Sequence, residues 1–150
     1  MAVVTFPDVP ATNGPLKLRR PAVYLCASGD STPGWLVQHA RELGRHIPTV
    51  FLPAAPRSAA ERKFLTQWAM LWMSAADVVG LWIEGAHWPQ FELGLALGRG
   101  DTLIVGLPEK CERERETVAG IFQALGTYDI PIYLNDDDWI TAIEATARGL

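Results

Sequence analysis

Short apolar runs alternate along the chain with longer stretches in which apolar residues recur every three or four positions. This alternation starts near Pro21 and repeats about five times, which predicts parallel strands joined by crossover helices. VVGLWI is apolar throughout, so we expect it to be a central strand buried on both faces. The predicted strands are AVYLCA (22–27), TVFLP (49–53), VVGLWI (78–83), TLIVGL (102–107) and IPIYL (130–134).

Capping residues and prolines mark where the intervening helices begin. Side-chain oxygens of Ser, Thr, Asn and Asp satisfy the free N–H groups of a first turn, and proline is well tolerated there. The third helix is expected to stop near Gly98 or Gly100. The starting signals are Ser31, Thr32 and Pro33 for the first helix, the capping box Ser58 and Glu61 for the second, Pro89 for the third, and Asn135 with Asp138 for the last.

Five strands with helical connections predict an open, doubly wound α/β sheet. We expect the flavodoxin-like (Rossmann-like) order 2-1-3-4-5, folded as a single domain over residues 21–150. Residues 1–20 carry prolines without periodicity and are predicted to form an extended arm. Sheets of this kind bind ligands beyond the carboxyl ends of the strands where the order reverses, here the first and third strands. Asp77 precedes the third strand at the opposite edge, so we interpret it as a structural cap.

Composition narrows the classes of partner. The chain has 150 residues, a net charge of −4 and no continuous basic stripe, so nucleic acid is not an expected partner. No segment approaches the roughly 18 apolar residues of a membrane span. The two cysteines, Cys26 and Cys111, form no CxxC pair, which favours a reducing cytoplasm. The spacing of potential ligands suggests neither a metal nor an organic cofactor.

The loop after the first strand combines small residues and hydroxyls at a helix amino terminus. Ser28, Gly29 and Asp30 could contact a sugar or a phosphate, or could simply form a capped tight turn. The carboxylate of Asp30 would repel a phosphate, so a sugar hydroxyl is the easier ligand.

The second loop at the expected switch point leads into the stretch WPQFELGLALGRG (88–100). Glu92 is predicted in the first turn of its helix, where the macrodipole favours the ionised carboxylate by roughly 0.3 to 1 kcal/mol. Two interpretations stay open at this point. Glu92 could be a nucleophile beside a ligand, or an acidic first-turn residue that only stabilises its helix.

A longer run, AADVVGLWIEGAHWPQFELGLALGRGDTLIVGL, together with VYLCASG and FLPAAPR upstream, resembles the nucleoside 2-deoxyribosyltransferase family and related nucleoside or nucleotide N-glycosidases. The most specific parts are the AD before the third strand, the ELG that opens the next helix, and the following VG. The resemblance implies that Glu92 attacks the anomeric carbon of a sugar and that Gly94 of the ELG lies at the substrate site. It also implies a flavodoxin-like fold, a nucleoside, nucleotide or free base as ligand, and a homo-oligomer.

The chain departs from the family at one position. The family usually carries a second carboxylate eight residues before the Asp of AD, and here that position is Ala69. A glycosyl transfer through a covalent intermediate normally needs a proton donor about 5 Å from the nucleophile. Histidine side chains commonly donate protons in catalysis, so His87 could donate instead, as could Glu84 or Asp30; a solvated loop histidine is the plainer interpretation of His87.

Further residues flank the expected site. Trp88 could stack on a base, and Trp35 could wall the pocket. Glu84 could face the ligand, and Arg57 resembles an arginine that follows proline in part of the family, so it could contact a sugar or phosphate or be solvated. Trp68 and Trp72 share one helical face and are interpreted as core.

Three hypotheses for function follow. The first is cleavage of a nucleoside N-glycosidic bond through a glycosyl-Glu92 intermediate, with transfer to another base or, if water is the acceptor, hydrolysis. The second is a non-catalytic nucleotide-binding module, motivated by Ala69. The third is an interaction domain whose arm (1–20) and charged ERERE helix carry the function.

Overall fold

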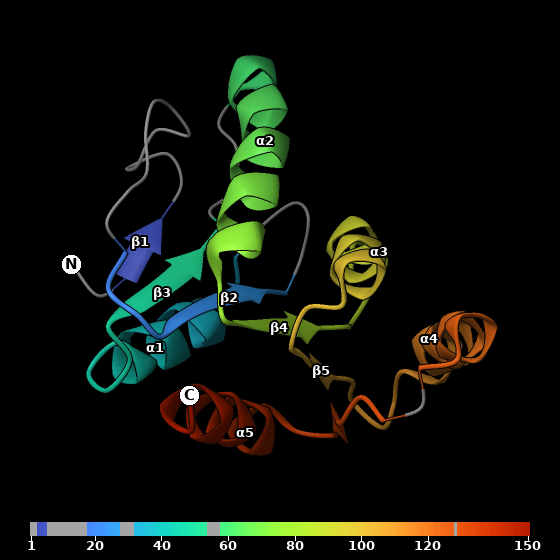
Figure 1. Cartoon of the computed structure of the whole chain (residues 1–150). Coiled ribbons are helices and arrows are strands. Elements are labelled where there is room, and N and C mark those ends of the chain that lie inside the picture. The colour runs from blue at the N-terminus through green and yellow to red at the C-terminus, as the bar shows by residue number, and fades with distance from the viewer. Residues whose placement is uncertain (1–2, 6–17, 28–31, 54–57, 128) are drawn as a thin grey trace.

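A parallel sheet with helices on both faces forms the molecule (Figure 1). The computed structural model describes residues 3–5, 18–27, 32–53, 58–127 and 129–150. The sheet has six strands in the order β1-β3-β2-β4-β5-β6, and every neighbouring pair is parallel. Without β1 this is the predicted order 2-1-3-4-5, so the doubly wound, flavodoxin-like fold is confirmed. The strands are β1 (Val3–Thr5), β2 (Ala22–Cys26), β3 (Thr49–Leu52), β4 (Val78–Trp82), β5 (Leu103–Gly106) and β6 (Ile132–Tyr133).

The additional strand, β1, comes from the predicted N-terminal arm. Val3 pairs with Val50 and Thr5 with Leu52, which places β1 outside β3 at the edge of the sheet. Part of the arm is therefore a strand rather than a free extension, because the edge of β3 offers unpaired N–H and C=O groups to any extended segment. Residues 6–17 of the arm lie outside the described residues.

Five helices cover the two faces. α2, α3 and α4 pack on one face, and α1 and α5 on the other (Figure 1). Alternating side chains of each strand point to opposite faces, so β2 sends Tyr24 toward α2 and α3, and Leu25 toward α1 and α5. The helices are α1 (Gly34–Leu43), α2 (Ala59–Ala75), α3 (Gln90–Arg99), α4 (Glu112–Leu125) and α5 (Asp136–Arg148).

The predicted caps form at two of the helix starts. Ser58 accepts a hydrogen bond from the N–H of Glu61 at 3.2 Å, and Asn135 accepts one from the N–H of Asp138 at 2.8 Å. Pro33 and Pro89 each stand one position before their helix rather than inside its first turn. α3 ends at Arg99 and is capped by Gly100, whose left-handed φ of 70° favours glycine.

The interpretation of Asp77 as a structural cap is confirmed. Its carboxylate accepts from the N–H of Ala22 at 2.8 Å and from Arg20, and its own N–H donates to the carbonyl of Ala22 at 2.7 Å. These bonds join the amino ends of β2 and β4, which fixes the register of the two strands whose carboxyl ends form the switch point. Within the described residues, no helix has the length and apolarity to cross a bilayer.

Candidate functional site

Glu92 lies in the first turn of α3, as the sequence predicts. Its side chain is half-buried, whereas its neighbour Phe91 is exposed. Burial raises the pKa of the Glu92 carboxyl, and its own backbone N–H, which donates to the carboxylate, partly opposes that shift. Both effects follow from position: the helix packs against the sheet, and its first N–H groups have no partner within the helix. The site therefore contains a carboxylate that is more basic than an exposed glutamate.

Tyr24, which the sequence pattern did not single out, lies on β2 and is fully buried. Its hydroxyl has no hydrogen-bond partner among the described residues. Burial raises the pKa of Tyr24 well above 10.0, and the nearby groups Cys26 and Glu92 raise it further. Tyr24 is consequently a neutral phenol whose protonation is influenced by the charge of Glu92. A buried hydroxyl that is not hydrogen-bonded costs free energy, so this one is available to donate to a ligand or to a carboxylate.

Ala69, which replaces the expected second carboxylate, is buried on α2. It belongs to the apolar layer between the sheet and α2 and α3 that also contains Tyr24, Trp88 and Leu93. Leu93 follows Glu92 directly. The position where the family carries an acid therefore lies within the layer that Glu92 borders, and this chain supplies a methyl group there.

The remaining predicted residues are not all brought to one place. Trp35 packs edge-on against Trp82 at 5.3 Å and Trp139 at 6.3 Å, on the face covered by α1 and α5 rather than on the Glu92 face. Trp88 is 8% exposed, so core packing accounts for it. Stacking on a base stays a prediction for Trp88, and a place in the wall of a ligand site stays a prediction for Trp35.

Glu84 is bonded to Trp82, the last residue of β4, and to Lys110, which lies between β5 and α4. Its carboxylate accepts from the indole N–H of Trp82 at 2.9 Å and pairs with Lys110 at 2.8 Å, and these bonds lower its pKa. An ionised carboxylate that accepts two hydrogen bonds is a poor proton donor near neutral pH, which disfavours Glu84 as the substitute acid; that role stays a prediction. A contact of Glu84 with substrate stays a prediction.

His87 is exposed in the loop between β4 and α3, and Gly94 is exposed on the surface of α3. Their roles as proton donor and substrate contact stay predictions. Ser28, Gly29, Asp30 and Arg57 lie outside the described residues.

We predict that Tyr24→Phe lowers activity without lowering stability. The substitution removes a buried hydroxyl that has no described partner, so the free energy of unfolding should stay level or rise, by up to about 1–3 kcal/mol. Where Glu92 reacts with a substrate, as the resemblance implies, loss of a donor beside it should still reduce kcat/KM. Urea unfolding and steady-state rates measure the two effects. Tyr133→Phe, in β6, is the matched control and should change neither the free energy of unfolding nor the rate by much. A Tyr24→Phe variant less stable than the wild type would contradict the assignment of the Tyr24 hydroxyl as unpartnered.

Comparison with known protein families and with curated proteins found no match for this chain.

Proposed function

We propose that the chain cleaves the N-glycosidic bond of a nucleoside or nucleotide through Glu92 and transfers the (deoxy)ribosyl group to another base. The observation that carries the proposal is the half-buried carboxylate of Glu92 in the first turn of α3, on the face of the sheet where the buried Tyr24 hydroxyl has no partner among the described residues. The resemblance of the AD, ELG and VG segments to nucleoside 2-deoxyribosyltransferases supports it. So does the fold, since ligands of doubly wound sheets bind at this edge.

In the proposed reaction, a carboxylate oxygen of Glu92 forms a bond to C1′ of the sugar while the bond from C1′ to the base nitrogen breaks. The bonding electrons leave with the base, which needs a proton. A nitrogen of a second base then attacks C1′, the ester bond to Glu92 breaks, and the incoming base releases its proton. With water as acceptor, the same intermediate gives a free sugar and the chain is an N-glycosidase.

The raised pKa of Glu92 suits this role. A more basic carboxylate is the better nucleophile, provided that it is ionised at the working pH. The helix amino terminus favours that ionised form. Tyr24, as a neutral donor, would orient the attacking oxygen or bind a sugar oxygen.

Ala69 favours one alternative from a different class, a nucleotide-binding module without turnover. General acid catalysis is typically worth 10²- to 10⁴-fold, and the chain has a methyl group where the family carries its acid. In the catalytic proposal, His87 in the β4–α3 loop supplies the proton. In the alternative, the residues around Glu92 bind the ligand and the N-glycosidic bond stays intact.

Product analysis separates these functions. The protein is incubated with deoxynucleosides, ribonucleosides and their 5′-monophosphates, with and without a free acceptor base, and the products are separated by chromatography. A new nucleoside that needs the acceptor establishes transfer, and free base without acceptor establishes hydrolysis. Ligand binding by calorimetry with no product from any substrate would reject the catalytic proposal in favour of the binding module.

The proposal extends to assembly and location. Phe64 and Leu71 on α2 and Phe91 beside Glu92 are all more than two-fifths exposed, and a second copy of the chain would cover such apolar surface. A homo-oligomer is therefore part of the proposal. A cytoplasmic location is also part of it, because Cys26 and Cys111 form no CxxC pair and are both free. Light scattering on the purified chain tests the assembly, and a monomer at micromolar concentration would reject it.

A further inference from the structure

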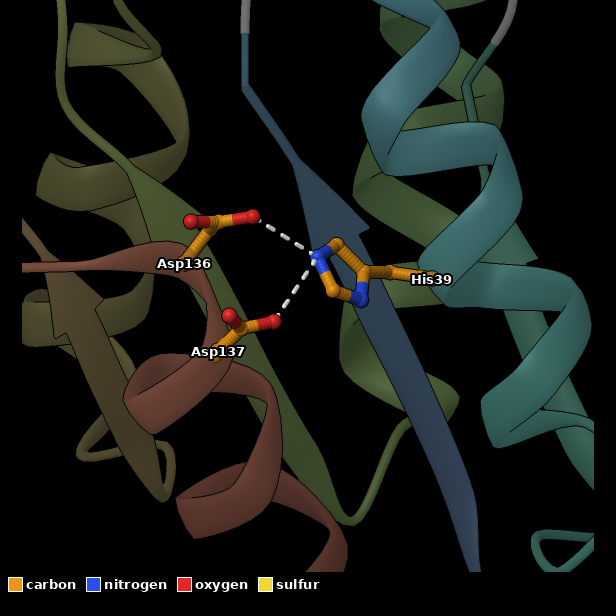
Figure 2. Close-up of side chains that lie close together, drawn as sticks. All are labelled: His39, Asp136 and Asp137. Atoms are coloured by element: carbon orange, nitrogen blue, oxygen red, sulfur yellow. Dashed lines mark hydrogen bonds and ion pairs between the residues drawn. The ribbon is translucent and has the colours of Figure 1, made fainter.

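On the face of the sheet opposite Glu92, three potential metal ligands meet between α1 and α5. His39 comes from α1, and Asp136 and Asp137 form the first turn of α5 (Figure 2). The Nε2 atom of His39 lies 2.8 Å from an oxygen of Asp136 and 3.9 Å from an oxygen of Asp137. One ligand atom from each residue lies within 4.8 Å of the other two. Residues 97 positions apart in the sequence thus converge on one point.

An acidic first turn needs no cation, because the helix macrodipole already favours negative charge there. The neighbouring Asp138 illustrates this plainer case, since its carboxylate is bonded to the side-chain amide of Asn135 at 2.8 Å. Asp136 and Asp137 differ because an imidazole nitrogen from another helix lies between them (Figure 2). His39 is also largely buried, with 16% of its side chain exposed, so its ring is held in place.

A cavity of about 320 Å³ adjoins the cluster and shares His39 and Asp137 with it. Among its lining residues, Glu42, Glu144 and Asp137 carry negative charge, Arg45 carries positive charge, and His46 offers a second imidazole. Glu144 also pairs with Arg148 at 3.4 Å. The cavity leaves space for water or a further ligand beside the three side chains, which a partly open metal site requires.

We infer that His39, Asp136 and Asp137 bind a divalent transition-metal cation, with Zn²⁺ the best match. Imidazole nitrogen and carboxylate oxygen are ligands that Zn²⁺ takes at about 2.1 Å, and two such ligands in a tetrahedral site lie roughly 3.4 Å apart. The two separations from Nε2, 2.8 and 3.9 Å, lie on either side of that value. Small rotations of the carboxylates would complete the geometry, and 86% of the Asp137 side chain is exposed and free to make them. The bound cation would replace the hydrogen bond between His39 and Asp136.

Such a site would cross-link α1 to α5. Both helices cover the same face of the sheet, and among the described residues their contact includes apolar packing and the ion pairs of His39 with Asp136 and Asp137. A cation joining them would stabilise the folded state in proportion to its affinity. The site takes no part in the chemistry proposed for Glu92, which lies on the other face, so the two proposals stand or fall separately.

The test is zinc binding by the full-length chain after treatment with EDTA. Calorimetry with ZnCl₂ should give one site per chain, and Tm should rise with zinc concentration. His39→Gln and Asp137→Asn should each weaken the affinity at least about tenfold. Asp138→Asn is the matched control: it removes the same charge from the same helix turn, one residue away, and should leave the affinity unchanged. Circular dichroism without metal establishes that each variant folds.

Co²⁺ identifies the ligand atoms, because thiolates give intense charge-transfer bands and imidazole with carboxylates does not. A thiolate band would assign the cation to Cys26 or Cys111 and overturn the proposal. The same conclusion would follow if Asp138→Asn weakened zinc as much as Asp137→Asn, since binding would then be nonspecific attraction to an acidic helix end. If zinc does not bind, the cluster is an ion pair only.

Discussion

Glu92→Gln should abolish product formation, lowering kcat/KM by about 10⁴-fold or more if Glu92 forms the covalent intermediate. Glutamine keeps the size and hydrogen-bonding shape of the side chain but has no oxygen able to form the glycosyl ester. A 2-fluoro-2-deoxy nucleoside should correspondingly add its sugar mass to the wild-type peptide that contains Glu92, and to no peptide of the variant. Labelling at another residue, or a variant as active as the wild type, would remove Glu92 from the nucleophile's role.

The same variant should be more stable than the wild type at neutral pH. The pKa of Glu92 is raised above 4.5 in the folded state, so the folded protein holds this proton more tightly than the unfolded chain does. The free energy of unfolding therefore falls as the pH rises through the window between the two pKa values. Glutamine does not ionise, so the variant does not lose this free energy of unfolding as the pH rises. Its Tm should therefore exceed the wild-type Tm at about pH 7 and equal it below about pH 4. Equal Tm values at neutral pH would show that burial of Glu92 carries no cost.

Restoring the missing acid with Ala69→Asp should raise turnover by about 10²- to 10⁴-fold over the matched variant Ala69→Asn. The asparagine fills the same volume and adds similar polarity, but it cannot donate a proton to the departing base. Comparing the two variants, rather than the aspartate with the wild type, removes the effect of enlarging a side chain in a packed layer. Initial rates with the best substrate from the product panel provide the measurement.

Both variants should also lose stability. Ala69 is only 4% exposed, and burying a polar side chain without partners costs about 1–3 kcal/mol. Assays are therefore run below the Tm of the weaker variant. If the aspartate and asparagine variants turn over equally, the proton comes from elsewhere. If neither turns over while both bind nucleoside, the chain is a binding module.

The central strands could be predicted from the sequence because each is a continuous apolar run, and the sheet order followed from having five such strands joined by helices. β2, β4 and β5 fall within one residue of the predicted limits, since burial on both faces leaves no ambiguity of period. The two strands at the edges of the sheet were harder to predict. The predicted last strand, IPIYL (130–134), is longer than the observed β6 (Ile132–Tyr133), which follows Pro131 and is partly exposed. β1 has no periodic signal of its own and becomes a strand only by pairing with β3.

Some residues of the candidate site could likewise be predicted from the sequence, and others could not. Glu92 could be predicted because its motif and its helix start are local in sequence. Tyr24 was missed, although a hydroxyl in the middle of a buried strand, with AVYLCA read as alternating faces, was a usable signal. The His39–Asp136 contact could not be predicted from spacing, because it depends on how α1 and α5 pack across the sheet. Long-range convergence of polar residues leaves no trace in a local pattern.

The packing of α5 has a consequence for the order of folding during synthesis. The ribosome releases α5 after every strand, yet Trp139, Ile140, Ile143 and Ala147 complete the layer over Val23, Val78 and Ile104. Gly80 and Gly106 lack side chains where the sheet meets α5 and Trp82, since a Cβ at Gly80 would collide with Ile143. Until α5 emerges, one face of the nascent sheet exposes these apolar strands to water, so a chain stalled before Asp136 should be a substrate for chaperones rather than a stably folded domain.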